Sequence, residues 1–293
     1  MFRLFLAFLA FNVIPISQVT VHVTLAFLEF LHFNSSTVNQ MKNHISAIKH
    51  FSHRFALHLS AFDDPKVTLY LTSVQKAAPF CVKIHNIIDI PLLKKIVTAC
   101  NLTYMGHIFK TIYLSAFFGF LRLSNLVPHS AATYSQLKHL SKGDIFLSNS
   151  HVTILLKWSK TLQMNNQARL LKLPRLNNDI CPFVAIQKCL QIVPGGSNAP
   201  LFQFKLKSTW IPLSDSRVRR HLKNVLTLCQ KHTDYVTFHS FRRSGATFAF
   251  NHNVPLQDIQ RHGTWTSDCV WRYVTDSTDA GCQGADTFAS LLS

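Results

Sequence analysis

Acidic residues are scarce in this chain. Only 13 Asp and Glu stand against 30 Lys and Arg in 293 residues, which gives a formal charge of +17 and a pI near 9.8. The excess positive charge is spread along the chain, and a basic surface of this kind usually faces nucleic acid. A ribosome-associated, a membrane-surface or a merely basic protein would share this charge.

Paired cysteines and metal-binding spacings are also missing. The seven cysteines form no CxxC pair, so we expect buried free thiols in a reducing compartment. The 16 histidines include no HExxH motif and no Cys/His finger spacing. We therefore predict neither a structural metal nor a cofactor.

No apolar run reaches the ~20 residues that span a bilayer. The segment MFRLFLAFLAFNVIP at the start is similar to a signal peptide, because a positive residue precedes an apolar run. It lacks a following small-residue cleavage site, and the scattered cysteines argue against export. We expect this segment to be a buried helix, with secretion as the alternative.

Apolar content is high, at 47% hydrophobic residues with 24 Phe. This excludes a disordered chain, and the length leaves room for two domains with cores of their own. Residues 1 to about 80 contain three helical runs, the third with Ser36 or Thr37 as N-cap and with a basic side. A short helix follows, and Pro79 lies in an extended linker where we place the domain boundary.

The second part combines helices with a small sheet. Residues 107–128 predict one long apolar helix that carries Arg122 near its end and stops at Pro128. The alternating segments 144–147, 151–158 and 168–174 predict three antiparallel strands, with Lys160 at a hairpin tip. A further short strand is expected over 201–204. The predicted fold class is mainly α with a small antiparallel β-sheet (α+β).

The stretch 239–273 concentrates groups that suit a phosphodiester. His239 and Arg242 stand three apart at the start of an amphipathic run, so a helix presents both on one face. Tyr273 follows, with Trp265 between them, in a last short helix that Thr266 or Ser267 could cap. A guanidinium binds phosphate bidentately, and a phenol can attack it.

Together these motifs resemble the tyrosine recombinase (phage integrase-like) family of DNA strand-exchange enzymes. FFGFLRLSNLV resembles the box with the family's first arginine, KWSKT its hairpin lysine, HSFRRSGAT its HxxR box and HGTWTSDCVWRYV its terminal box. The matching residues are, in chain order, Arg122, Lys160, His239, Arg242, Trp265 and Tyr273. The motif style, with SNL, WSKT and GTW, is closest to recombinases of eukaryotic mobile elements of the Crypton or DIRS kind.

The resemblance implies a mechanism of cutting and rejoining DNA without ATP. Tyr273 would attack a phosphorus and form a 3′-phosphotyrosyl ester, with His239 as base and Lys160 as the acid for the leaving 5′-oxygen. Arg122 and Arg242 would bind the phosphate oxygens. The family's tryptophan position would pack against the nucleophile or donate its indole N–H to the phosphate.

The resemblance also implies an architecture and partners. A helical core DNA-binding (SAM-like) domain is expected over 1–85 and a tyrosine recombinase catalytic domain over 90–293, together clamping double-stranded DNA. The tail after Tyr273 is expected to exchange between protomers of a homo-tetramer, with a frayed end as the alternative. We expect no membrane partner. The expected location is the nucleus if the chain is eukaryotic, and otherwise the interior of the cell together with DNA.

Two positions depart from the family pattern. Asn125 stands where the family often has Glu or Asp, three residues after its first arginine. Gly263 is followed by Thr264 and only then by Trp265, so His262 is an alternative to Trp265. A catalytically decayed or domesticated DNA-binding protein is therefore the alternative function. A monomeric type IB topoisomerase and a secreted or lipid-surface basic protein are further rivals.

Overall fold

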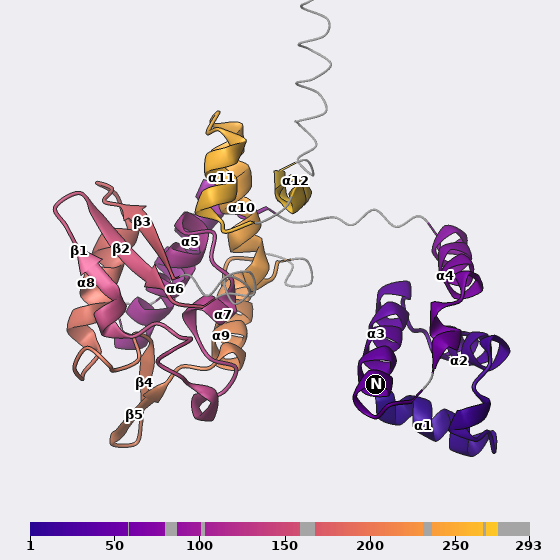
Figure 1. Cartoon of the computed structure of the whole chain (residues 1–293). Coiled ribbons are helices and arrows are strands. Elements are labelled where there is room, and N and C mark those ends of the chain that lie inside the picture. The colour runs from indigo at the N-terminus through magenta and orange to yellow at the C-terminus, as the bar shows by residue number, and fades with distance from the viewer. Residues whose placement is uncertain are drawn as a thin grey trace, which may run out of the picture. The chain divides into compact units, whose positions relative to one another are not determined.

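The computed structural model describes residues 1–57, 59–79, 87–100, 103–158, 168–230, 236–265 and 268–274. The chain divides into two compact units, Met1–Lys83 and Ile84–Ser293, where the sequence predicted domains over 1–85 and 90–293. Helices dominate both units, and small antiparallel sheets occur in the second (Figure 1), which confirms the predicted fold class. None of the helices in these ranges has the length and apolarity that a membrane crossing needs.

The described part of the first unit is helical throughout its core. Its α-helices are α1 (Phe2–Phe11), α2 (Val21–Phe33), α3 (Val38–Arg54) and α4 (Pro65–Ala77). The largest fully buried side chains of this unit include Phe5, Phe27, Leu28, Met41 and Ile48. Helix α3 begins with a capping box, because the Thr37 N–H donates to Gln40 Oε1 at 2.7 Å and the Gln40 N–H donates to Thr37 Oγ1 at 3.3 Å. Thr37, and not Ser36, is the N-cap.

Helix α1 is buried on one side only, which corrects the expectation of a buried helix. Phe5 and Leu9 lie in the core, whereas Phe11 is 88% exposed and Leu4 and Leu6 reach the surface. The apolar sequence continues around the whole helix, but only one face packs in the core of this unit.

Helix α6 (Tyr104–Phe118) is the central element of the second unit (Figure 1). Each of its residues from Thr111 to Phe117 is buried, and it packs against α8 (Pro182–Ile192) and α10 (Phe238–Asn251). The other α-helices described in this unit are α5 (Ile90–Ala99), α7 (Leu123–Leu126), α9 (Asp215–Leu228), α11 (Leu256–His262) and α12 (Trp271–Val274). The contact between α6 and α10 places the two arginine-bearing segments of the predicted site beside each other.

The predicted single helix over 107–128 is wrong at its C-terminal end. Helix α6 stops at Phe118, and Phe120 adopts a left-handed backbone with φ of 48°. The chain is extended at Arg122, which is the N-cap of the single-turn helix α7. Apolar residues continue through this turn, so their pattern did not mark it. A long-range hydrogen bond holds it instead, because the Arg242 guanidinium donates to the Phe120 carbonyl.

The predicted three-stranded sheet is present. Strands β1 (Ile145–Leu147), β2 (His151–Leu156) and β3 (Arg169–Pro174) are antiparallel in the order β1-β2-β3. Ile154 pairs with Ile145 on one side and with Leu171 on the other, and alternate residues of β2 are buried. A second hairpin joins β4 (Gln203–Leu206) to β5 (Thr209–Pro212), where the sequence predicted only one strand, over 201–204.

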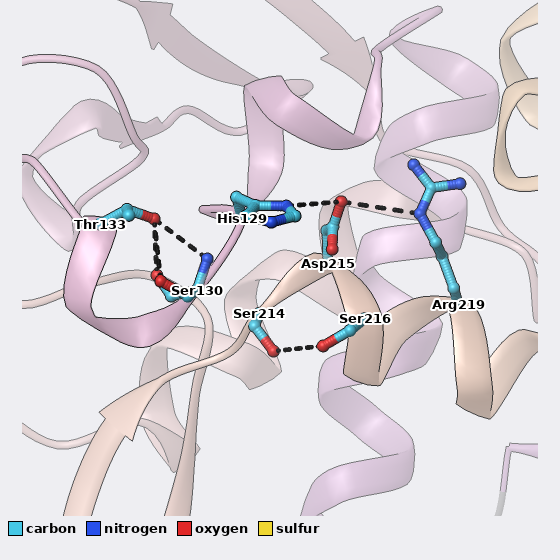
Figure 2. Close-up of polar contacts among 7 residues, drawn as sticks. All are labelled: His129, Ser130, Thr133, Ser214, Asp215, Ser216 and Arg219. Atoms are coloured by element: carbon cyan, nitrogen blue, oxygen red, sulfur yellow. Dashed lines mark hydrogen bonds and ion pairs between the residues drawn. The ribbon is translucent and has the colours of Figure 1, made fainter. Parts of the chain in front are cut away.

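The start of helix α9 is bound to the segment that follows α7. The Asp215 N–H donates to the Pro128 carbonyl at 2.9 Å, and the Asp215 carboxylate lies 3.6 Å from both His129 Nδ1 and Arg219 Nε (Figure 2). The start of helix α9 is thereby fastened to Pro128 and His129, which follow α7. Its exposed face is basic, with Arg217, Arg219, Arg220 and Lys223 at the surface.

The cysteines within the described ranges are free thiols. Cys100, Cys181 and Cys189 are buried, whereas Cys229 and Cys269 are half-buried. Burial raises the pKa of Cys189 to about 12, so this thiol is protonated at neutral pH. The expectation of buried free thiols thus describes three of these five, while Cys81 and Cys282 lie outside the described residues.

Candidate active site

Helix α10 carries the first two predicted site residues. Its first turn is fixed by the Thr237 N–H, which donates to Ser240 Oγ at 3.1 Å, and its core face buries Phe238 and Phe241. His239 is exposed, and Arg242 follows one turn later on the same helix. The two residues, three apart in sequence, therefore lie about one turn apart on a helix, as the sequence predicted.

Arg242 is the largest fully buried side chain of the described protein, at 1% exposure. Its Nη1 donates to the Phe120 carbonyl, and its Nη2 donates to the Gly263 carbonyl at 2.7 Å. Burial above all, together with the positive charge of Arg122, lowers the pKa of Arg242 to about 10. At neutral pH the group remains a cation, and its Nε is a buried donor without a partner in the described part of the chain.

Arg122 enters the same site from the turn after α6. Its backbone N–H donates to Asn125 Oδ1 at 3.0 Å, which holds the extended conformation of this residue. Its side chain is half-buried and close enough to Arg242 to lower the pKa of that group. Arg122 Nη1 is a second buried N–H donor without an acceptor among the described residues.

Tyr273, on helix α12, lies against the imidazole of α10. Its hydroxyl is 3.1 Å from His239 Nε2, a hydrogen-bond distance at which either group can donate according to the histidine tautomer. The Tyr273 carbonyl accepts a hydrogen bond of 2.7 Å from Thr247 Oγ1, which fastens α12 to α10. The guanidinium carbons of Arg242 and Arg243 lie 5.8 and 5.7 Å from the centre of the phenol ring.

Trp265 occupies the space between the phenol and the buried arginine. Its ring centre is 5.0 Å from that of Tyr273 and 4.0 Å from the guanidinium carbon of Arg242. The side chain is 5% exposed, and its Nε1 is a third buried donor without a partner in the described chain. Its ring folds back over Gly263, where an added Cβ would come within 1.7 Å of the indole.

His262, the alternative to Trp265, lies elsewhere. Its Nε2 is 2.7 Å from the Phe118 carbonyl at the end of α6, and its ring packs edge-on against Phe120 at 4.8 Å. Burial lowers the pKa of His262, so the neutral ring donates to that carbonyl. Trp265, and not His262, contacts the phenol.

Five of the six predicted site residues thus come together, and Lys160 lies outside the described residues. Thr266, Ser267 and the tail after Val274 also lie outside. Sequence reasoning missed Thr247, the Phe120 carbonyl and the role of Gly263, because only the folded backbone brings them to Tyr273, Arg242 and Trp265.

The site is rich in positive charge and in unsatisfied donors. Six buried side-chain polar atoms lack a partner in the described chain, and three of them are the N–H groups of Arg122, Arg242 and Trp265. Buried donors in native proteins are nearly always satisfied, so this cluster fits an anion with several acceptor oxygens. Among the described residues, no group of His, Cys, Asp or Glu is arranged to hold a metal ion.

The sequence matches no protein-family model and no curated protein sequence. Its fold, however, is similar to solved structures of DNA recombination proteins. An integrase of the Tn1549 transposon in complex with circular intermediate DNA superposes with a TM-score of 0.60 at 12% identity, over 92% of this chain and 86% of that one. The XerH site-specific recombinase bound to its difH substrate gives 0.61 at 14% identity, over 93% and 71%. A lambda integrase dimer bound to a core site gives 0.56 at 16% identity, over 90% and 82%. The shared property is the fold of tyrosine recombinases and integrases.

Proposed function

We propose that this protein is a tyrosine recombinase, a DNA strand-exchange enzyme that cuts and rejoins duplex DNA through a 3′-phosphotyrosyl intermediate. The observation that carries the proposal is the cluster of three unsatisfied N–H donors around the hydrogen-bonded pair of Tyr273 and His239. The basic composition and the likeness to recombination proteins solved on DNA support it.

Tyr273 is the nucleophile in this proposal. Its oxygen attacks the phosphorus of one backbone diester, a new bond between that oxygen and phosphorus forms, and the bond from phosphorus to the 5′-oxygen breaks. His239, 3.1 Å from the hydroxyl, accepts the phenolic proton. One ester replaces another, so the reverse attack by a 5′-hydroxyl rejoins the strand without an external energy source.

Arg122, Arg242 and Trp265 stabilise the charge that grows on the non-bridging oxygens. The carbonyls of Phe120 and Gly263 already hold two nitrogens of Arg242, so its guanidinium is oriented before the DNA binds. Preorganised donors of this kind are the largest single contribution in many enzymes. Removing one commonly raises the barrier by ~3–4 kcal/mol, roughly a hundredfold or more in rate.

Lys160 donates the proton that the leaving 5′-oxygen needs. This role follows from its place in the KWSKT motif, two residues after Trp158 in the connection between β2 and β3. An ammonium group can supply the proton that the poor alkoxide leaving group lacks.

The partner of the site is double-stranded DNA, bound by the core-binding unit over 1–85 and by the catalytic unit over 90–293. Strand exchange requires two DNA sites, and we propose a homo-tetramer that exchanges the tail after Tyr273. The motif style suggests an origin in a eukaryotic mobile element, with the nucleus as the place of action. No membrane partner is proposed.

A nicked suicide substrate tests this function. After one strand is cut, a short 5′-hydroxyl fragment diffuses away and the covalent intermediate accumulates. We expect the wild-type protein to retain labelled DNA on a denaturing gel and Tyr273→Phe to bind DNA without retaining it. A wild-type protein that binds duplex DNA but never forms the adduct is instead the catalytically decayed or domesticated DNA-binding protein.

A further inference from the structure

Helix α12 carries the proposed nucleophile but consists of a single turn. It spans Trp271–Val274, and so short a segment has too few hydrogen bonds of its own to be a stable helix. Its position therefore depends on contacts with its surroundings. Val274 is fully buried, and the Trp271 ring packs edge-on against Phe250 of α10 with 6.2 Å between the ring centres. Apolar packing is not directional, so these contacts alone do not fix the orientation of Tyr273.

Thr247 adds a directional contact. This threonine lies in α10 and is 2% exposed, and its Oγ1 donates to the Tyr273 carbonyl at 2.7 Å. A threonine inside a helix often bonds back to a carbonyl of its own helix. Here the hydroxyl instead binds the backbone of the residue that bears the phenol. Because a buried hydroxyl is costly to leave without a partner, this bond restrains α12 against α10.

One side of α10 contacts Tyr273 at three successive levels. His239, Arg243 and Thr247 recur every four residues, so the helix presents them along one side. His239 Nε2 is 3.1 Å from the phenol oxygen, the Arg243 guanidinium carbon is 5.7 Å from the ring centre, and Thr247 holds the carbonyl. The hydroxyl, the ring and the backbone of Tyr273 are thus all contacted by the helix that also carries Arg242.

We infer that Thr247 is a positioning residue that fixes the nucleophile helix, so that the Tyr273 oxygen stays within reach of the phosphorus. The inference rests on the proposed function, in which that oxygen attacks a phosphate bound by Arg242. The Thr247 hydroxyl acts through the Tyr273 backbone, so it serves the bond-forming step and not the binding of DNA. When α12 is free to shift, the phenol spends less time in the attacking position and the rate falls accordingly.

Two substitutions distinguish positioning from packing. Thr247→Ser keeps the hydroxyl and removes a buried methyl group, whereas Thr247→Val keeps the methyl group and removes the donor. A role in packing alone predicts that Ser is the worse replacement. The inference predicts the opposite order, because only Ser can still donate to the Tyr273 carbonyl.

The assay is single-turnover adduct formation on the nicked suicide substrate at saturating DNA. We expect Thr247→Val to lower the rate roughly ten- to hundredfold and Thr247→Ser to stay within about threefold of wild type. The Kd for DNA should not change in either variant.

Thr111→Val is the matched control. The Thr111 hydroxyl is also fully buried, and it donates to the Ala185 carbonyl at 3.0 Å, which joins α6 to α8. This variant loses a comparable bond between helices away from Tyr273, so it should lose stability in urea unfolding and keep its rate of adduct formation. Thr247→Ala replaces Thr247→Val if the latter does not fold, because Ala differs from Ser only by the missing hydroxyl.

Three results would overturn the inference. The first is a rate for Thr247→Val, or for Thr247→Ala in its place, that equals or exceeds that of Thr247→Ser. The second is an equal loss of rate in Thr111→Val. The third is a Thr247→Val protein whose only defect is weaker DNA binding.

Amide hydrogen exchange of the free protein separates this inference from the proposed function. Exchange in the peptide covering residues 268–274, followed from the millisecond range, is expected to be faster in Thr247→Val than in wild type or Thr247→Ser. Equal exchange in all three proteins contradicts the role of Thr247 whatever the enzyme does. If wild type forms no adduct, the proposed function fails, while the exchange result still decides whether Thr247 holds α12.

Discussion

Gly263→Ala is expected to disable the site from a position that carries no side chain. A Cβ at Gly263 would lie 1.7 Å from the Trp265 ring, whereas ordinary van der Waals contact begins at 3.4 Å. The ring has to move by the difference, about 1.7 Å. Trp265 is 5% exposed, its ring centre lies 4.0 Å from the guanidinium carbon of Arg242, and Tyr273 lies beside it. Movement of the ring therefore disturbs the guanidinium, the phenol or both.

The expected magnitude follows from that displacement. Overpacking a buried site costs about 1–3 kcal/mol of unfolding free energy. A shift of about 1 Å in an active-site group costs on the order of a hundredfold in rate. Urea unfolding measures the first quantity, and single-turnover adduct formation on the suicide substrate measures the second.

Gly196→Ala is the matched control for this prediction. A Cβ at Gly196 meets nothing within 4 Å, so this variant should stay within about 0.5 kcal/mol of wild type and keep its rate. If Gly263→Ala behaves like Gly196→Ala in both assays, Trp265 is not held over Gly263 and the account of the site is wrong.

Three further predictions concern assembly, DNA binding and stability. Because Tyr273 forms a hydrogen bond with His239 of its own chain, a mixture of the Tyr273→Phe and Arg122→Ala proteins should form no covalent adduct with DNA. Adduct from this mixture would mean that the phenol of one protomer acts in the site of its neighbour. Arg219 and Lys223 line a groove of about 210 Å³ with Thr237 and Phe238, next to His239. Replacing both with Ala should weaken DNA binding and reduce the slope of log K against log salt concentration by about 2, and an unchanged slope would show that they do not contact DNA phosphates. Burial lowers the pKa of His221 from 6.5 to about 4, so its contribution to the free energy of unfolding is complete above about pH 6.5 and is lost as the pH falls toward 4. His221→Gln should flatten the dependence of that free energy on pH over this window in urea unfolding, and an unchanged dependence would contradict the lowered pKa.

Local patterns in the sequence were sufficient to predict much of the fold. The alternation in 151–158 matches the burial of Val152, Ile154 and Leu156 in β2, and the N-cap of α3 was narrowed to Ser36 or Thr37 from their position before an amphipathic run. The spacing of His239 and Arg242 was informative because α10 is a regular helix. Each of these features depends on neighbours within a few residues, which a pattern can register.

Features that depend on backbone groups distant in sequence could not be predicted from the sequence. The reversal at Phe120 interrupts an apolar run and is held by Arg242, which lies 122 residues later. The second hairpin pairs Phe204 with Ile211 across a turn at Lys207, whose φ is 53° and whose residue type does not mark such a turn. Spacing alone could not decide between His262 and Trp265, because the choice depends on which ring folds back over Gly263.

The most direct test of the central claim is to locate the bond between protein and DNA. After reaction with the nicked duplex, proteolysis and mass spectrometry of the retained DNA should find a 3′-phosphate esterified to the peptide that contains Tyr273, and no other modified peptide. DNA joined to a different residue, or through a 5′-phosphate, would contradict the proposal.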